Sequence, residues 1–244
     1  MDYHVPPRTD AIEKLENFII VNRISPNMRI PSERDLCKMW GMNRTTLHFA
    51  VNTLVEEGRL YRVKGAGTYV AEPKQLRNLL GVSSLTQEIR QQGTQFTTKI
   101  LSVRVIDATK QVSKKLKIPL GKKVFEIIRL RMISSVPCII ETLYLDCERF
   151  PDFDKYYSEK SSMHAIFTNI YKVDEVSGEE KISVTYTSEE ESQLLGVPEE
   201  SPIFFTSGIT MTGEKEIIEY YKALFRADRF KFVSMIDRNK LEGD

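Results

Sequence analysis

The chain has 244 residues, with 35 Lys and Arg against 34 Asp and Glu, and its net charge of +1 identifies no polyanionic partner. This length suits one large domain or two small ones. The three cysteines, Cys37, Cys138 and Cys147, form no CxxC pair, and the three histidines lie far apart in sequence. We therefore expect reduced thiols and neither a metal site nor another cofactor. A signal-peptide hydrophobic region and an apolar run of ~18 residues are both missing, which predicts a cytoplasmic protein without a membrane span.

The first elements predicted along the chain are two helices separated by a break. Apolar residues recur at helical spacing over residues 9–23, which indicates a helix. The stretch "SPNMRIPSERDL" interrupts it. Ser32 is a suitable N-cap, and Asp35 follows three residues later in a capping-box arrangement. We expect a short second helix that ends near Met39.

A third helix and a hairpin follow. Asn43 is its predicted N-cap, and Gly58 ends it as a C′ residue. The runs "RLYRV" and "TYVA" resemble strands, and "KGAG" between them is a hairpin signal. One side of the helix carries an apolar stripe at helical spacing, made of Leu47, Ala50, Val51, Leu54 and Val55.

This order of elements is that of a winged helix-turn-helix, which suggests DNA binding. A recognition helix packs through one apolar face and presents a polar N-terminal edge to the major groove. Arg44, Thr45 and His48 lie at that edge, off the apolar stripe. Arg can bind guanine through two hydrogen bonds, and Thr can contact phosphate or a thymine methyl group. Residues 29–77 hold nine Lys or Arg against five Asp or Glu, a weak basic excess that a solvated surface would explain equally well.

The hairpin tip has a composition that suits a DNA groove. Gly65 and Gly67 add no side-chain bulk, so the backbone can approach a narrow groove, and Lys64 can meet phosphate. The alternative is a small helical domain whose charges are merely solvated. Each element alone fits that alternative, whereas all of them in sequence favour DNA binding.

The segment "IPSERDLCKMWGMNRTTLHFAVNTLVEEGRLYRVKGAGTYV" resembles the DNA-binding domain of GntR-family bacterial transcription regulators. The resemblance covers roughly residues 9–71 and includes PSERDL, RTT, the EEG turn and GxGTYV in order. It implies phosphate contacts from Ser32 and Arg34 and a wing tip formed by Lys64, Gly65 and Gly67. It places Arg44, Thr45 and Thr46 at the major groove. His48 stands where Arg is common, and Lys64 where Gln or Arg is common, so the operator sequence is open.

The remainder, from about Leu79, reads as an α+β domain with a single core. Residues 72–78 are polar and begin a linker, so we expect a winged domain over 1–72, a linker over 73–80 and a second domain over 81–244. Helices are predicted for 161–171 and 188–196. Strands are predicted for 97–106, 123–133, 138–146, 202–211, 215–225 and 229–237.

This second domain resembles the UTRA effector domain of the HutC-type branch, which has a chorismate-lyase-like α/β fold. The resemblance rests on "SSLTQEIRQQG", "RLRMISSVPCIIETLYLDCERFPDF", "SMHAIFTNIY" and "EYYKALFRADRFKF". It implies a homodimer held by these domains. Phe225 stands where related sugar-phosphate sensors carry Tyr, which weakens the case for a sugar. The resemblance also implies an effector site formed by Ser84, Leu85, Thr86, Arg129, Arg131, Glu141, Ser162, Glu219 and Phe225.

Residue chemistry agrees with a small anionic effector such as a phosphorylated sugar. Arg129 and Arg131 project from one face of a predicted strand between Ile127 and Ile133, and two guanidiniums in such a setting suggest a shared anion. Free N–H groups at the helix start near Ser84 also favour anions. The alternative for the arginine pair is an exposed sheet edge, with the arginines bonded to Glu126 or Glu141.

These observations predict a ligand-responsive transcription regulator, most often a repressor in this branch, that binds a pseudo-palindromic operator as a dimer. One alternative is a chorismate-lyase-like enzyme fused to a DNA-binding domain. Glu141 and Glu219 are its only acid–base candidates, and no nucleophile–base motif accompanies them. The other alternative is a regulator that binds no effector. We expect a regulator rather than an enzyme.

Overall fold

The computed structural model describes residues 7–63, 65–78, 85–86, 89, 93, 95–173 and 177–234. The chain divides into two compact units, Met1–Lys74 and Gln75–Asp244. Each unit has hydrophobic clusters of its own. Among the described residues, no helix is long and apolar enough to cross a membrane. No group of three or more His, Cys, Asp or Glu suited to a metal ion occurs in the same part of the chain.

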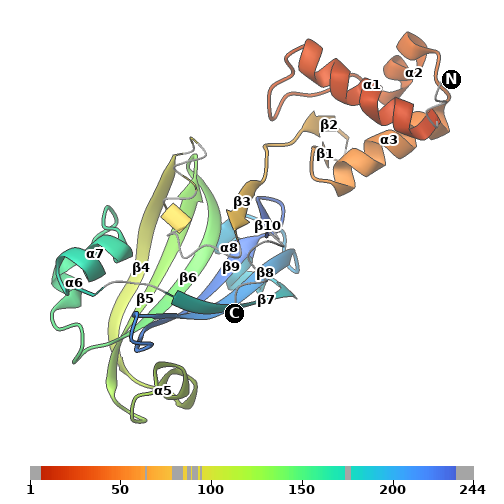
Figure 1. The fold of residues 1–244 in the computed structure, drawn as a ribbon. Coiled ribbons are helices and arrows are strands. Elements are labelled where there is room, and N and C mark those ends of the chain that lie inside the picture. Colours follow the sequence, from red (N-terminus) through yellow and green to blue (C-terminus); the bar gives the residue numbers. More distant parts are fainter. Residues whose placement is uncertain are drawn as a thin grey trace, which may run out of the picture. The chain divides into compact units, whose positions relative to one another are not determined.

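The first unit contains three helices whose caps follow from the sequence (Figure 1). The Ser32 side chain accepts a hydrogen bond from the Asp35 N–H at 3.2 Å, and the Ser32 hydroxyl donates to the Asp35 carboxylate at 2.6 Å. Asn43 accepts from the Thr46 N–H at 2.8 Å, as predicted. Gly58 has φ +70°, which suits the predicted C′ residue. The helices are α1 (Pro7–Val21), α2 (Glu33–Trp40) and α3 (Arg44–Glu56).

A two-stranded hairpin completes this unit. Strand β1 (Leu60–Val63) pairs antiparallel with β2 (Gly67–Val70), and Arg29 forms an isolated bridge to Tyr69 of β2. The predicted winged helix-turn-helix is therefore confirmed. Its core combines residues of the α3 stripe with residues from α1, the segment before α2, α2 and β1, namely Leu15, Ile30, Leu36, Leu47, Val51, Leu54 and Leu60.

The second unit is built on a six-stranded antiparallel sheet with the strand order β4-β5-β6-β9-β8-β7 (Figure 1). A second, two-stranded sheet pairs β3 (Gln75–Asn78) in parallel with β10 (Phe230–Val233). The strands of the large sheet are β4 (Phe96–Asp107), β5 (Lys123–Ile133), β6 (Val136–Asp146), β7 (Ser177–Tyr186), β8 (Pro202–Met211) and β9 (Ile217–Arg226).

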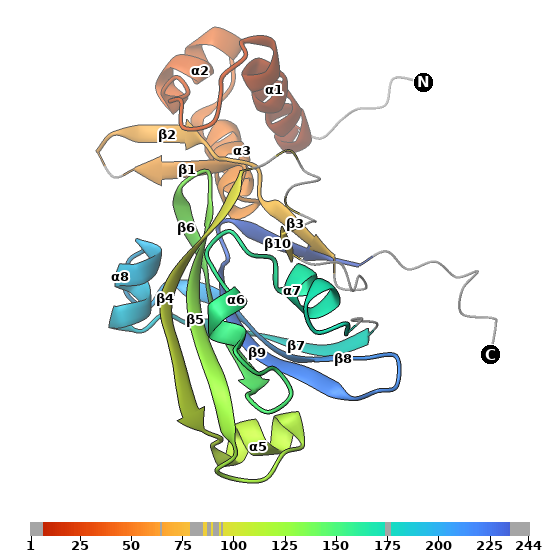
Figure 2. The ribbon, with the colours of Figure 1, turned by 90° about the vertical axis from the view of Figure 1, so that its left-hand side faces the viewer.

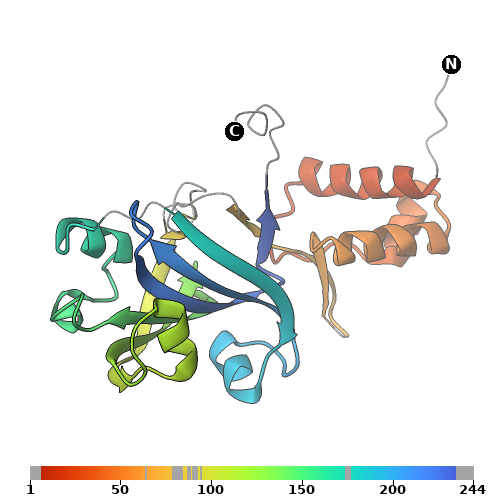
Figure 3. The ribbon, with the colours of Figure 1, turned by 60° about the horizontal axis from the view of Figure 1, so that its bottom comes forward.

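Short helices cover both faces of this sheet. On one face, α6 (Phe153–Tyr156) and α7 (Met163–Asn169) pack over Ile127 of β5 and Leu143 of β6, and Figure 2 shows them in front of the strands. On the other face, α5 (Lys110–Leu116) packs against Val124, and α8 (Glu189–Leu195) packs against Leu130 and Ile140. Figure 3 shows α5 and α8 on the same side of the curved sheet.

In the described part of the second domain, the predicted strands and helices occur with small shifts of their ends, and the mixed α and β fold class is confirmed. Residues 235–237 of the last predicted strand and most of the helix predicted to start near Ser84 lie outside the described residues. Four described elements were not predicted. Strand β3 occupies part of the expected linker 73–80, so that segment is not wholly a connection. Helices α5 and α6 and edge strand β7 were missed as well. The alternation of Ile182, Val184 and Tyr186 with polar residues covers only the second half of β7, and most of the strand is exposed on both faces, so its first half carries no apolar signal.

Candidate functional site

The N-terminal edge of α3 is polar and open to solvent. Arg44, Thr45 and His48 are exposed, whereas Leu47 and Val51 on the opposite side are fully buried. The Asn43 cap fixes the first turn of the helix. These residues can therefore reach a duplex while the other side of α3 stays in the core. Thr46 lies in the same turn and is half-buried.

Glu33 connects this edge to α2 and to the hairpin. Its carboxylate bonds to Nδ1 of His48 at 3.0 and 3.2 Å. The same carboxylate accepts from Nη2 of Arg62, on β1, at 3.3 Å. Neither Glu33 nor Arg62 was singled out from the sequence. Glu33 lies between Ser32 and Arg34 in the PSER motif, so its position in the motif was an available signal.

The two wing glycines differ in what surrounds them. Gly65 has φ +77°, and a Cβ built there would meet no atom within 4 Å. Gly67 has φ +125°, and its Cβ would lie 2.6 Å from Nε of Arg29. Both positions lie in the left-handed region that favours glycine. Lys64 lies outside the described residues.

The two residues expected to contact phosphate, Ser32 and Arg34, differ in how available their side chains are. Arg34 is exposed at the first turn of α2. The Ser32 hydroxyl, in contrast, is engaged with Asp35 as the helix cap. A second cation near this surface is Arg8, whose guanidinium carbon lies 4.6 Å from the ring centroid of the exposed Phe49 on α3.

In the second unit, Arg129 and Arg131 form a buried cluster with Glu141. Arg129 pairs in register with Glu141 across β5 and β6, and its Nε donates to Oε2 of Glu141 at 2.6 Å. Nη1 of Arg129 donates to the Tyr157 hydroxyl at 3.0 Å. The two arginines are only 6% and 5% exposed. The exposed-edge alternative is wrong for these residues, because β5 lies between β4 and β6, although the bond to Glu141 that it expected is present.

Arg131 connects the cluster to Thr86 through a hydrogen bond. Its Nη2 donates to the Thr86 hydroxyl at 2.5 Å, and its Nη1 donates to Oε2 of Glu141 at 3.3 Å. The guanidinium carbon stands 4.3 Å from the centroid of the Phe96 ring. Its Nε is buried and has no hydrogen-bond partner among the described residues. Arg131 is therefore incompletely satisfied, whereas Arg129 is held by both Glu141 and Tyr157.

The electrostatics of the cluster are unbalanced. Burial alone would raise the pKa of Glu141, but Arg129 and Arg131 lower it to about 2, so this carboxylate stays ionised. Burial, reinforced by the nearby charge of Arg129, lowers the pKa of Arg131 to about 10. Burial opposes the charge of Arg129 too, yet Glu141 and Tyr157 hold its pKa above the ordinary value. Two cations thus share one carboxylate.

The other predicted effector residues lie around this sheet face without joining the hydrogen-bonded cluster. Glu219 is buried on β9 and accepts from the Thr210 hydroxyl at 3.0 Å. Phe225 packs edge-on against Phe230, in the cluster that includes Leu85. Ser162 caps α7 by accepting from the Ala165 N–H at 3.5 Å. Ser84 lies outside the described residues.

The sequence analysis missed one residue of the cluster and one group of polar residues on this face. Tyr157 lies 28 positions from Arg129 in the sequence, so no local pattern indicated their contact. The group of polar residues lies on β7, β8 and β9. The Tyr221 hydroxyl donates to Glu180 at 3.0 Å, and the hydroxyl oxygen of the fully buried Thr206 has no partner among the residues that the structure describes. Thr206 pairs with Ala223, which pairs with Glu141, so its side chain projects from the face of the arginine pair.

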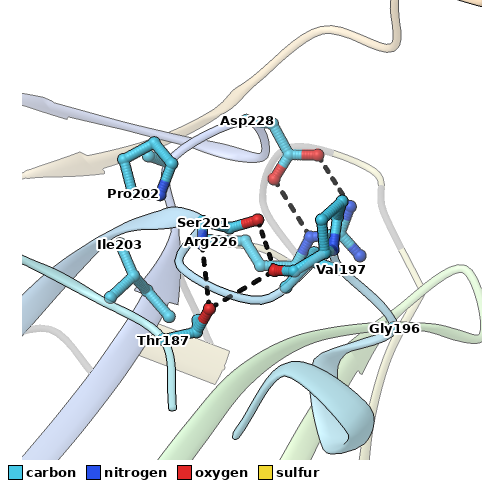
Figure 4. A pocket seen from close by; sticks show the side chains of 10 residues that line it. Thr187, Gly196, Val197, Ser201, Pro202, Ile203, Arg226 and Asp228 are labelled. Atoms are coloured by element: carbon cyan, nitrogen blue, oxygen red, sulfur yellow. Dashed lines mark hydrogen bonds and ion pairs between the residues drawn. The ribbon is translucent and has the colours of Figure 1, made fainter. Parts of the chain in front are cut away.

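A separate cavity of about 290 Å³ lies where the turn after α8 meets the end of β9 (Figure 4). Arg226 donates to both carboxylate oxygens of Asp228, at 3.0 and 2.6 Å. The Ser201 hydroxyl donates to the Pro198 carbonyl at 2.7 Å, and the backbone N–H of Ser201 donates to the Thr187 hydroxyl. These polar groups bond to one another, so the cavity does not resemble the unbalanced cluster on the other face.

A winged helix-turn-helix followed by a sheet domain with a buried, positively charged cluster defines a regulator with one DNA-binding and one ligand-binding domain. The chain belongs to the gntR family of bacterial regulatory proteins and carries a UTRA domain: the gntR model matches residues 7–70 and the UTRA model matches residues 91–231. The resemblance found in the sequence is thereby confirmed. The chain is a ligand-responsive bacterial transcription regulator.

Similar proteins agree with this classification. The HTH-type transcriptional repressor NagR of Bacillus subtilis (strain 168) is 26% identical over 237 residues, 96% of each chain. The histidine utilization repressor of Pseudomonas putida is 27% identical over 192 residues, 79% of this chain and 77% of that protein. The crystal structure of PhnF from Mycobacterium smegmatis shares the fold, with a TM-score of 0.70 and 22% identity, and the match covers 93% of this chain and 99% of that one.

Proposed function

We propose that this regulator is a repressor that binds a pseudo-palindromic operator as a homodimer, and that a small anion bound by Arg129 and Arg131 controls it. The observation that carries this proposal is the buried cluster in which two guanidiniums share Glu141, while the Nε of Arg131 has no partner in the part of the chain that the structure describes. Phosphorylated sugars are the leading candidates. Loss of the Tyr hydroxyl at Phe225 leaves other small acids open.

Charge balance supports an anionic ligand. A buried cation is costly unless a partner of opposite charge accompanies it, and Glu141 balances only one of the two arginines. A phosphate or carboxylate offers acceptors in the planar geometry that guanidinium binds best. We expect the anion to bind Arg131 beside Thr86, with Ser84 and Leu85 supplying contacts from the same segment. Glu141, Ser162, Glu219 and Phe225 would surround the rest of the ligand.

The first unit supplies the operator contacts in this proposal. Arg44, Thr45, Thr46 and His48 read base edges from α3, while Ser32 and Arg34 hold phosphates. Lys64, Gly65 and Gly67 form the wing tip. One such domain reads only a few base pairs, so useful specificity requires two half-sites and hence two copies of the chain.

Edge strand β7 offers a surface for the second copy. Its Val184 and Tyr186 project from the sheet face that carries the arginine pair, because the in-register pairs run from Val184 through Phe204, Phe225 and Ile139 to Arg131. Val184 and Tyr186 are 65% and 67% exposed, which is unusual for large apolar side chains on neighbouring positions of one strand face. Burying such residues favours association with another apolar surface, and an identical copy provides one.

A melting-temperature screen of the full-length protein tests the effector proposal. The ligands are inorganic phosphate, hexose 6-phosphates, amino acids and small carboxylates. We expect a phosphorylated compound to raise the melting temperature of the wild type and of Arg104→Ala, a control that removes an exposed arginine from β4. Arg131→Ala should lose that rise. A normal response of Arg131→Ala would place the effector elsewhere, and no response of the wild type to any anion would contradict an anionic effector.

A further inference from the structure

At the exposed edge of α3, one carboxylate joins side chains from three separate elements. Glu33 of α2 bonds to Nδ1 of His48 on α3 and to Nη2 of Arg62 on β1. The Glu33 side chain is 22% exposed, whereas those of His48 and Arg62 are 53% and 40% exposed. The carboxylate is thus set back from the surface, and the two groups that it holds reach solvent.

We propose that Glu33 is a specificity-determining positioning residue, which fixes His48 in the tautomer whose Nε2 accepts a hydrogen bond from a base. The inference rests on the proposed role of α3 in reading DNA. An ionised carboxylate only accepts hydrogen bonds, so Nδ1 of His48 must carry the hydrogen in this contact. A neutral imidazole has one N–H, and its other nitrogen is then an acceptor.

The consequence is a specific base preference. In the major groove, the amino groups that donate are N6 of adenine and N4 of cytosine. An acceptor on α3 therefore favours adenine or cytosine at the position that it meets. An arginine at this place has only donors and would favour guanine. With His48 held by Glu33, this position of α3 presents an acceptor, the Nε2 of His48, where an arginine would present only donors.

Arg62 completes the arrangement through charge. A bare carboxylate near a phosphate backbone would be repelled by it, and Arg62 compensates this charge through Oε1 of Glu33. The ion pair itself adds little stability, since such partly exposed pairs are typically worth ~0–1 kcal/mol. We therefore expect the main effect of Glu33 on operator choice rather than on folding.

The test is selection of bound DNA from duplexes with a randomised central segment, with full-length protein at mildly alkaline pH, where imidazoles are generally neutral. The variants are Glu33→Gln and the control Glu16→Gln. Glu16 is a matched control because it also pairs with an arginine, Arg59, and its side chain is 25% exposed. Both variants raise the net charge equally, so electrostatic attraction to DNA changes alike.

We expect the wild type and Glu16→Gln to select one motif with adenine or cytosine at a symmetric position. Glu33→Gln should lose that preference by about fivefold, the effect of one hydrogen bond, and keep the other positions. Gln can donate to Nδ1, so the carboxylate's control of the tautomer is lost. An unchanged motif for Glu33→Gln would overturn the proposal, as would equal weakening at all positions. Selection of no motif by the wild type would instead refute DNA reading itself.

A second variant links the effect to His48. His48→Arg replaces the acceptor with donors, so the preference at the same symmetric position should change to guanine. A change at a different position, or no change, would show that His48 does not read this base. Melting temperatures of all variants, measured without DNA, should lie close to that of the wild type, and a large loss in Glu33→Gln alone would assign Glu33 a structural role.

Discussion

Arg129 and Glu141 face each other in register on β5 and β6, and the Nε of Arg129 lies 2.6 Å from Oε2 of Glu141. The same Oε2 is 3.3 Å from Nη1 of Arg131. One carboxylate oxygen therefore compensates two buried cations. This makes Glu141 essential to the stability of the second unit, independently of any part that it has in effector binding.

Glu141→Gln should destabilise the second unit by about 3–5 kcal/mol, because it leaves buried guanidiniums without their counter-charge. The measurement is urea unfolding followed by far-UV circular dichroism, while fluorescence of Trp40, the single tryptophan, reports the first unit separately. Glu148→Gln is the control, since the Glu148 side chain is 81% exposed. Equal stability of Glu141→Gln and the wild type would contradict the charge argument.

The same residue predicts a pH dependence. The pKa of Glu141 is lowered from its ordinary value of 4.5 to about 2 in the folded protein, so ionisation of Glu141 stabilises the folded state fully at pH values above 4.5. This contribution should be lost as the pH falls from about 4.5 to about 2. The difference in unfolding free energy between wild type and Glu141→Gln should shrink over that interval. A constant difference would show that Glu141 titrates normally.

The arginine pair illustrates how far sequence reasoning reached. The alternation along β5 correctly placed Arg129 and Arg131 on one face with apolar neighbours. It did not indicate their depth, because burial depends on β4 and β6 on either side and on the helices above. Tyr157 and Phe96 complete the cluster from distant segments, and no local pattern connects them to an arginine on β5.

The first unit was more predictable because its signals are local. The caps at Ser32 and Asn43, the apolar stripe of α3 and the glycines of the hairpin all act within a few residues. The missed strand β7 shows the opposite case. It carries Glu179, Glu180 and Lys181 near its start, and these charges interrupt the apolar alternation that would mark a strand.

The wing glycines permit a clean test of backbone approach to DNA. Gly65→Asn should lower operator affinity with little change in melting temperature. Asn tolerates positive φ, and no atom lies within 4 Å of the new Cβ, so the fold accommodates it, whereas the added side chain occupies space next to the duplex. Gly67→Asn is the contrasting variant and should melt earlier, because its Cβ would meet Arg29. Unchanged affinity of Gly65→Asn, measured by fluorescence anisotropy, would place the wing tip outside the groove.

The proposed dimer surface can be tested on β7. Val184→Glu should shift the protein from dimer to monomer in light scattering at micromolar concentration, because it puts a charge into an apolar contact. Val105→Glu is the matched control, since Val105 is 55% exposed on the opposite edge strand β4. A monomeric wild type would refute the homodimer. A dimeric Val184→Glu variant would locate the interface on another surface.

Arg44 offers the most direct test of the reading edge on α3. It is exposed at the first position of the helix, next to the Asn43 cap. Arg44→Ala should cost about 1–3 kcal/mol in operator binding and relax base preference at the contacted position. Arg23→Ala, which removes an exposed arginine after α1, should change affinity much less.

Titrations at several salt concentrations distinguish a base contact of Arg44 from a phosphate contact. Loss of a base contact lowers affinity for the operator far more than affinity for unrelated DNA. Loss of a phosphate contact weakens binding to both DNAs and reduces the salt dependence of binding. If Arg44→Ala weakens binding to both DNAs equally, Arg44 holds phosphate, and base reading falls to Thr45 and His48.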